Sequence, residues 1–182
     1  MRKIYIILML NLLFACSRKD RTEVETDGKY RMEKVFKDNI LASSTTFEGS
    51  IMVFYAEYSD DILVKGTEYY PDQKVKAVHQ LTKAPNHYTE TKYRKNGAIR
   101  SQGESDRIIG SDIFLKRGGT IYYTENGKIS EIMVFKNDKH KEFLIRHTIL
   151  DTLKEVIIFD QTYDPPITID EFNDGSKSKD VP

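Results

Sequence analysis

The octapeptide YRKNGAIR, residues 93–100, places an Asn-Gly pair between a tyrosine and a β-branched residue. Asn-Gly between extended runs is the strongest short-range signal of a β-hairpin, because a type I′ turn needs two successive residues with positive φ. The same frame recurs in YTENGKIS (123–130) and, with Asp-Gln in place of Asn-Gly, in YYPDQKVK (69–76). The sequence therefore predicts repeated β-hairpins that carry Asn96-Gly97 and Asn126-Gly127 at their tips.

The composition of the chain beyond residue 15 favours strands throughout. This part holds 16 Ile and 9 Val against 7 Leu and 5 Ala, and branching at Cβ restricts χ1 in helices but packs well on a pleated surface. Further turn signals follow at intervals of roughly 8–12 residues, the spacing typical of short antiparallel strands. They are Asp27-Gly28, Asp60-Asp61, Pro71-Asp72, Gly118-Gly119 and Asn137-Asp138. We expect an all-β fold, an antiparallel meander of short strands.

Two segments leave their secondary structure open. Residues 30–41 and 149–159 carry apolar residues near helical spacing, but the second contains the β-rich run VIIF (156–159), and we favour strand for both. Residues 86–94 carry few apolar groups and are expected to form a solvated strand. Pro165-Pro166 is expected to interrupt the last segment of the sheet, because proline has no N–H to donate to a ladder.

The N-terminal segment is expected to be a targeting signal. The apolar run IYIILMLNLLFA (4–15) is shorter than the about 20 residues that cross a membrane as a helix, and it has the length of a secretory signal. It leads into LFAC (13–16), which resembles a bacterial lipobox, although Phe14 departs from the usual residue there. The resemblance implies cleavage before Cys16 and attachment of a diacylglyceryl lipid to its sulfur. Ser17 in place of Asp implies retention in the outer membrane, by analogy with lipoprotein sorting.

These signals divide the chain into four parts. Residues 1–15 are the signal peptide, 16–27 the lipidated cysteine with a charged tether, 28–172 the β-repeat domain, and 173–182 a polar, disordered tail. The 28 basic residues balance the 28 acidic ones, so the chain has no global field that would attract nucleic acid.

The repeated frame resembles the variant MORN repeat, a β-hairpin unit built around Tyr, Asn-Gly and Ile or Leu. The matching residues are Tyr93, Asn96-Gly97, Ile99, Gly103, Gly110, Gly119, Tyr122-Tyr123, Asn126-Gly127-Lys128, Ile129 and Glu131. The resemblance covers residues 69–136, lacks the family's usual Trp, and has an insertion around Lys116-Arg117. It implies hairpins that bury their core by stacking on their neighbours, a broad exposed face suited to binding, and no shared catalytic residue. Some members carry an antitoxin-like label.

The sequence offers little chemistry. Cys16 is the one cysteine, which excludes an internal disulfide and a multi-cysteine metal site. The histidines are His79, His87, His140 and His147. His79 and His87 are the only pair placed to approach across a hairpin, solvated strand histidines are the simpler interpretation, and no metal or cofactor is predicted. Glu104 and Asp106 alternate on one strand face, where paired carboxylates can serve catalysis but charges that block edge aggregation are far more common.

Five tyrosines of the repeat region form the candidate binding surface, because an aromatic ring offers a large, flat contact with a polar end. They are Tyr69, Tyr70, Tyr93, Tyr122 and Tyr123. The sequence thus favours a non-enzymatic, membrane-anchored envelope lipoprotein whose β-hairpin repeats bind an envelope protein or a glycan. One alternative is a small envelope hydrolase with an unrecognised site. Another is an immunity, antitoxin-like or envelope-bridging β-sheet protein, which would expose a sheet edge or an acidic face.

The lipobox makes a direct prediction for Cys16→Ser. Without the cysteine sulfur there is no acceptor for the lipid, so the variant is expected to lose its lipid mass and to leave the membrane fraction. Cell fractionation and intact-mass spectrometry of the purified chain measure both effects. A variant that keeps its mass and stays in the membrane fraction would disprove the lipoprotein assignment.

Overall fold

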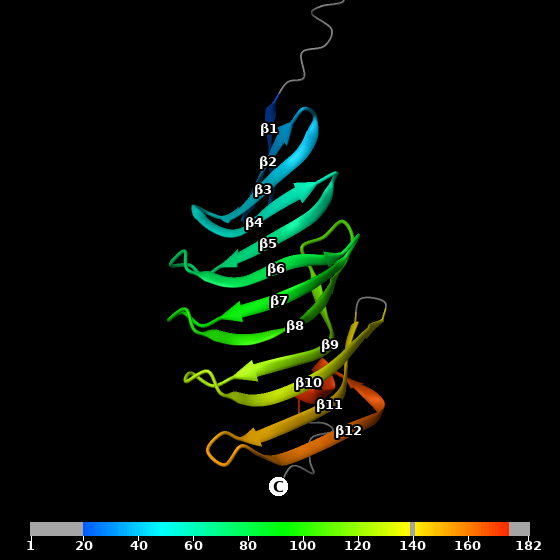
Figure 1. The fold of residues 1–182 in the computed structure, drawn as a ribbon. Helices are drawn as coiled ribbons and strands as arrows, with labels where there is room; N and C mark the ends of the chain where they lie inside the picture. Colours follow the sequence, from blue (N-terminus) through cyan, green and yellow to red (C-terminus); the bar gives the residue numbers. More distant parts are fainter. Residues whose placement is uncertain (1–19, 139–140, 175–182) are drawn as a thin grey trace, which may run out of the picture.

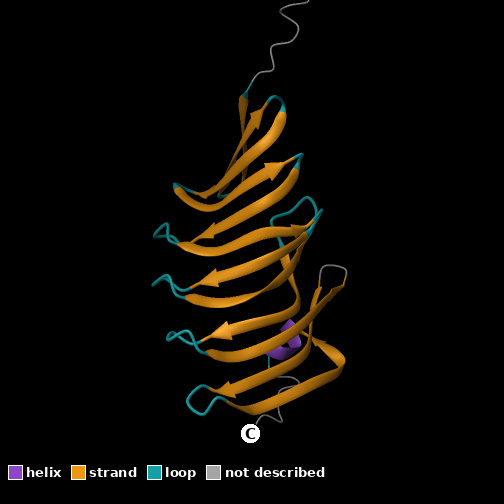
Figure 2. Cartoon of the chain, in the orientation of Figure 1, coloured by secondary structure: helices purple, strands orange, loops and turns teal. Residues whose placement is uncertain are grey.

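The computed structural model describes residues 20–138 and 141–174, and there the chain forms one sheet of twelve antiparallel strands (Figures 1 and 2). Each strand pairs with the strands that precede and follow it in the sequence. The strands are β1 (Arg21–Asp27), β2 (Tyr30–Lys37), β3 (Ile40–Glu48), β4 (Ile51–Ser59), β5 (Ile62–Tyr69), β6 (Val75–Lys83), β7 (His87–Tyr93), β8 (Ile99–Arg107), β9 (Phe114–Tyr123), β10 (Ile129–Asp138), β11 (Lys141–Asp151) and β12 (Val156–Thr168). A short helix, α2 (Ile169–Asn173), follows β12. The predicted all-β meander is confirmed.

Both segments whose secondary structure the sequence left open are strands. Residues 30–41 form β2, a two-residue turn and the start of β3, because Asp38 and Asn39 both adopt positive φ (52° and 67°), as a type I′ turn requires. Residues 149–159 form the end of β11 and the start of β12, joined by a turn that closes with positive φ at Glu155 (56°). Pairing with neighbouring strands therefore overrides the helical spacing of the apolar residues.

The three copies of the repeated frame fold into the same turn. In each copy, the first turn residue donates its N–H to the carbonyl four positions later; the pairs are Tyr70 with Lys74, Arg94 with Ala98, and Thr124 with Lys128, each at 2.8 Å. In every copy, the residue three positions after the donor has positive φ. These residues are Gln73 (63°), Gly97 (86°) and Gly127 (78°). Asn96-Gly97 and Asn126-Gly127 thus lie at hairpin tips with positive φ at glycine, as predicted. The asparagines do not share the positive φ, so the expected type I′ geometry is wrong here.

Two expected turn or break signals lie inside strands, and a third, Asn137-Asp138, lies at a strand end whose last residue, Asp138, pairs with Lys141 at the start of β11. Gly118-Gly119 belongs to β9, where the register with β8 shifts and Gly118 has a φ of 60°, which forms a β-bulge. Pro165-Pro166 lies within β12. Thr162 pairs with Arg146 and Ile167 pairs with Leu144, so residues 163–166 form a bulge opposite the single residue Ile145, and the strand continues beyond it. The bulge keeps the prolines, which have no N–H, out of the regular ladder.

Part of the expected tether is a strand. Residues 21–27 form β1 and pair with β2 along their whole length, although every one of them is exposed. Backbone hydrogen bonds and ion pairs such as Lys34–Glu25 (2.6 Å) hold β1 in place of apolar burial. The expected tail begins at Asn173, which is the last residue of α2, and residues 175–182 lie outside the described part of the chain.

The core is small and consists of two clusters on the sheet. The first holds Phe54, Ala56, Leu63 and Tyr88, and the second holds Phe135, Leu144, Tyr163 and Ile167. Residues from α2 extend the second cluster. Tyr88 corrects the expectation of a solvated strand over 86–94, because its ring is only 1% exposed and its hydroxyl donates to the Leu63 carbonyl at 2.6 Å. A single aromatic residue with a bonded hydroxyl thus anchors a strand that is otherwise polar in composition.

The shared turn predicts opposite effects for two substitutions. Gly97→Val is expected to destabilise the chain by about 1 kcal/mol or more, because a β-branched residue strains positive φ. A Cβ at Gly97 would meet no atom within 4 Å, so a loss of stability reports backbone strain alone. Gln73→Gly relieves the same strain but removes the exposed hydrogen bond from the Gln73 amide to the Met52 carbonyl (3.2 Å), so it is expected to leave stability unchanged or raise it by less than about 1 kcal/mol.

Urea unfolding followed by circular dichroism measures both changes. Equal effects of the two substitutions, or a neutral Gly97→Val, would show that these turns do not share one conformation in solution.

Candidate functional site

The five tyrosines named from the sequence are all half-buried. Tyr69, Tyr93 and Tyr123 occupy equivalent positions, as the last residues of β5, β7 and β9. The hydroxyl of Tyr70 donates to the Tyr93 carbonyl at 2.8 Å, and that of Tyr123 donates to the Gln102 side chain at 3.0 Å. These rings pack along the sheet, and their role in binding stays a prediction.

A column of apolar side chains runs beside them, on the side of the sheet where the turns from odd- to even-numbered strands lie. Its members are the first residues of the six even-numbered strands: Tyr30, Ile51, Val75, Ile99, Ile129 and Val156. All six are exposed, by 37–48%. Two strand spacings, about 9.5 Å, separate consecutive members, since each hairpin contributes one. Figure 1 shows hairpin tips stacked along this side of the sheet. We call these six residues the apolar tip column; the repeated sequence frame pointed to the strand starts at Val75, Ile99 and Ile129, but not to the other three or to the alignment of all six.

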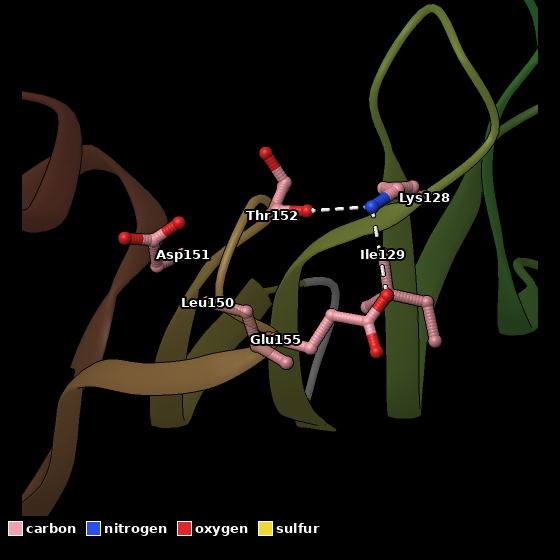
Figure 3. Close-up of a pocket in the computed structure, with 6 residues that line it drawn as sticks. All are labelled: Lys128, Ile129, Leu150, Asp151, Thr152 and Glu155. Carbon is pink, nitrogen blue, oxygen red and sulfur yellow. Dashed lines mark hydrogen bonds and ion pairs between the residues drawn. The ribbon is translucent and has the colours of Figure 1, made fainter.

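The surface between neighbouring tips is hollowed. Figure 3 shows the hollow of about 270 Å³ between the β9–β10 and β11–β12 tips, where Ile129 and Leu150 give an apolar wall. Lys128 closes it by donating to the Thr152 carbonyl at 3.0 Å and pairing with Glu155 at 3.5 Å. An apolar residue of the column and a lysine therefore lie together at this tip.

The equivalent hollow between the β5–β6 and β7–β8 tips measures about 600 Å³. Val75, Val78 and Tyr93 line it together with Lys74 and Lys95. At these two gaps the apolar tip column is recessed and not flat; basic groups border both recesses, and Asp151 and Glu155 also line the one at Lys128.

His79 lies in a different place and environment from the one expected. Its ring is fully buried and stacks on Phe114 with 3.7 Å between ring centroids. Its Nε2 lies 3.1 Å from Glu68, and its Nδ1 lies 3.6 Å from Glu90, a carboxylate that is itself buried. The solvated interpretation of this histidine is therefore wrong.

The strand register explains why His79 and His87 do not meet. It places His79 opposite Glu90, and Lys83 opposite His87. Within residues 20–138 and 141–174, no group of three or more His, Cys, Asp or Glu side chains is arranged to hold a metal ion.

The charges around His79 alternate across β5, β6 and β7. Lys76 pairs with Glu68 at 2.9 Å, and Lys92 pairs with Glu90 at 3.0 Å. The hydrogen bond with His79 lowers the pKa of Glu68 to about 2, against an opposing effect of burial and with further help from Lys76. A carboxylate held by such partners stabilises the fold in its ionised form. The cluster is therefore a structural network beneath Phe114.

A second buried histidine repeats this pattern near the C-terminal end. His147 on β11 places its Nε2 2.5 Å from Glu131 on β10, and its ring meets Phe159 and Phe172 edge-on at 5.4 Å. In both places a histidine pairs with a glutamate of the preceding strand and contacts aromatic rings. His147 thus joins β10, β11, β12 and α2 around the second core cluster.

His87 belongs to a third cluster, which is partly open to solvent. Its Nδ1 contacts the Asp106 carboxylate, which also accepts from the Asn137 amide at 3.1 Å and lies 3.4 Å from Arg117. Burial would raise the pKa of Asp106, but hydrogen bonds from His87 and Asn137 and the charge of Arg117 lower it on balance. Asp106 is therefore the centre of a network drawn from four strands, and not a free edge charge.

A hollow of about 290 Å³ lies beside this cluster. Its lining residues are Thr82, Lys83, His87, Tyr88, Glu104, Ser105 and Arg117. The hydroxyl of Thr82 donates to the His87 backbone carbonyl at 3.1 Å, and not to the imidazole. Glu104 shares the hollow with His87 but contributes no contact to the Asp106 network, so the structure separates the two carboxylates that the sequence paired.

Comparisons with known proteins give no identity: no family model matches the chain, and no curated protein matches it. Residues 20–138 and 141–174 contain no helix with the length and apolar character needed to cross a membrane. Cys16 and His140 lie outside the described residues.

The low pKa of Glu68 predicts a specific acid sensitivity. A folded-state pKa of about 2 against an ordinary 4.5 means that the stabilisation is present above pH 4.5 and is lost as the pH falls towards 2. Glu68→Gln is expected to destabilise the chain at pH 7 by on the order of 2–3 kcal/mol, and the difference from the wild type should vanish near pH 2.

Urea unfolding at a series of pH values measures this difference, and Glu104→Gln serves as the control that should track the wild type. A Glu68→Gln curve that runs parallel to the wild type at every pH would contradict the assignment.

Proposed function

We propose that this chain is a lipid-anchored envelope protein whose β-hairpin sheet is a non-enzymatic binding module, and that the apolar tip column contacts the partner. The observation that carries the proposal is the alignment of six exposed apolar residues, one from each hairpin. Single exposed apolar residues are normal on a protein surface, whereas aligned ones are typical of an interaction site.

The shape of the column favours an extended partner. Consecutive members stand about 9.5 Å apart along the row of hairpin tips, and two of the gaps between tips are recessed. A partner that follows the column must therefore be a long segment of an envelope protein or a glycan chain. The shared geometry of the three repeated turns is consistent with the variant MORN resemblance, whose family implies a binding role.

The lipid anchor rests on the lipobox-like sequence before Cys16. Because β1 starts at Arg21, only four residues lie between this cysteine and the sheet, so the two can be at most about 17 Å apart. Lipidation of Cys16 would hold the β1 end of the sheet near the outer membrane and direct the other strands away from it.

One observation favours a second candidate, a small envelope hydrolase. His87 places Nδ1 against the Asp106 carboxylate and 2.8 Å from the Arg117 guanidinium, and a hollow lined by Lys83 and Arg117 lies beside it. The pairing resembles the base and orienting carboxylate of acyl-transfer sites, but the hydroxyl of Thr82 does not bond to the imidazole. The binding module therefore stays the first proposal.

The tip column gives the test of the main proposal. The double variant Ile99→Glu, Ile129→Glu is expected to reduce capture of the partner at least tenfold, because it places charges at the centre of an apolar contact. Ile40→Glu is the matched control. Ile40 also begins a strand and is similarly exposed, but it lies on the opposite side of the sheet, where the turns from even- to odd-numbered strands lie. Pull-down of envelope proteins and co-sedimentation with purified cell-wall glycan measure capture and separate the two partner classes.

If the double variant captures the partner as well as the wild type does, the apolar tip column is not the binding site. If His87→Ala folds and captures the partner normally but abolishes the protein's function in the cell, the hydrolase becomes the first proposal in place of the binding module.

A further inference from the structure

Positive charge that the fold does not neutralise gathers at one place along the row of hairpin tips. The recess between the β5–β6 and β7–β8 tips is lined by Lys74, Arg94 and Lys95, and no acidic side chain is among its lining residues. Within residues 20–138 and 141–174, Arg94 and Lys95 have no carboxylate within ion-pair distance, and Lys74 reaches only the exposed Asp72, at 3.8 Å. This recess is therefore a cationic surface that lacks its own counter-charge.

Cations at other tips of the row lie beside carboxylates. Lys29 pairs with Glu48 at 2.5 Å, and Lys128 pairs with Glu155 at 3.5 Å in a recess that Asp151 also lines. Lys154 has no ion pair in the described part of the chain, but its turn also carries Asp151 and Glu155. An anion that approaches the row of tips is therefore drawn towards the recess between the β5–β6 and β7–β8 tips.

The same recess has apolar walls and an ordered guanidinium. Val75, Val78 and Tyr93 supply aliphatic and aromatic surface, and the volume of about 600 Å³ lies within the about 300–1,000 Å³ of small-molecule sites. Arg94 donates from Nη2 to the Tyr123 carbonyl at 2.6 Å, which orders the side chain without neutralising it. A guanidinium forms paired hydrogen bonds with a carboxylate or a phosphate. The recess thus combines anion-binding groups with a surface for an apolar body.

We propose that this recess binds an acidic glycan, a sugar chain that carries carboxylate or phosphate groups. A sugar ring has an apolar C–H face, which packs on Tyr93 and the two valines, while Lys74, Arg94 and Lys95 bind the acidic groups. The inference rests on the proposed function, because it gives a chemical class to the partner of the apolar tip column, to which Val75 belongs.

The backbone around the recess favours a glycan over an acidic polypeptide. β5 to β8 are interior strands of the sheet, so they offer no open edge for an added strand. In the β7–β8 turn, the Arg94 N–H donates to the Ala98 carbonyl, the Gly97 N–H to the Arg94 carbonyl, and the Ala98 N–H to the Asn96 side chain. The β5–β6 turn repeats the first two bonds. The recess therefore offers side chains for recognition, and not a backbone ladder.

Direct binding to the purified full chain in a nonionic detergent tests the proposal. The probes are carboxymethyl dextran and dextran phosphate, with unmodified dextran of the same length as the neutral control and polyglutamate as the acidic polypeptide. Isothermal titration calorimetry is expected to show that at least one charged dextran binds at least tenfold more tightly than both unmodified dextran and polyglutamate.

Substitution of the lysines locates the binding. The double variant Lys74→Gln, Lys95→Gln is expected to raise the dissociation constant for the charged dextran at least tenfold, because it removes two of the three cations and keeps the Arg94 hydrogen bond. Lys154→Gln is the matched control, since Lys154 is also an exposed tip lysine without an ion pair, and it should change the constant less than about twofold. Circular dichroism checks folding, and if the double variant unfolds, Lys95→Gln alone decides, with an expected loss of at least threefold.

Three results would overturn the proposal. They are no binding of either charged dextran, binding of polyglutamate as tight as that of the charged dextrans, and equal weakening by Lys154→Gln and the double variant. The second would assign the recess to an acidic protein segment, and the third would show attraction by general charge alone.

Failure of this inference is distinguishable from failure of the proposed function. If Ile99→Glu, Ile129→Glu loses capture of the envelope partner while the wild type binds no charged dextran, the binding module stands and only the acidic-glycan assignment falls. If that variant captures the partner fully while the lysine variants lose the charged dextran, the apolar tip column is excluded and the recess stands as a glycan site.

Discussion

Backbone pairing between consecutive strands is the interaction on which the rest of this molecule depends. Each strand bonds only to its neighbours in the sequence, and the two apolar clusters contain four buried residues each. β1 shows that the ladder with a few surface ion pairs suffices to hold a strand, because β1 pairs along its full length with no buried residue. A fold of this kind is fixed by its turns, since a turn sets the register and a slip of one residue would move every side chain to the other face.

The register also decides which polar groups can be buried. His79 is fully buried only because β5 and β7 bring Glu68 and Glu90 beside it. A buried ionisable group without partners costs several kcal/mol, so this network and the register stabilise each other. Its position beneath Phe114 ties the middle of the sheet to β9. Polar contacts thus supply part of the stabilisation that a larger apolar core gives in a two-layer fold.

The open architecture leaves its borders uncovered, and three of them differ in chemistry. The hairpin tips on one side carry the apolar tip column with its recesses, and the terminal strands carry charged residues at β1 and apolar ones at β12. A meander that does not bury its borders can use each for a separate contact. The proposed partner site occupies only the border formed by these hairpin tips.

Local chemistry explains what the sequence by itself determined. Asn-Gly turns, β-branched residues and the recurring Tyr-to-Ile frame gave the meander and the tips at Gly97 and Gly127, because turn geometry is set by a few adjacent residues. The tertiary structure alone decided the burial of Tyr88 and His79, the half-burial of the five tyrosines, and the gathering of His87, Asp106, Arg117 and Asn137 from four strands. These features depend on register and bulges accumulated across many strands, such as those at Gly118 and Pro165-Pro166. No single segment encodes them, since a side chain's surroundings come from strands on either side that are distant in the sequence.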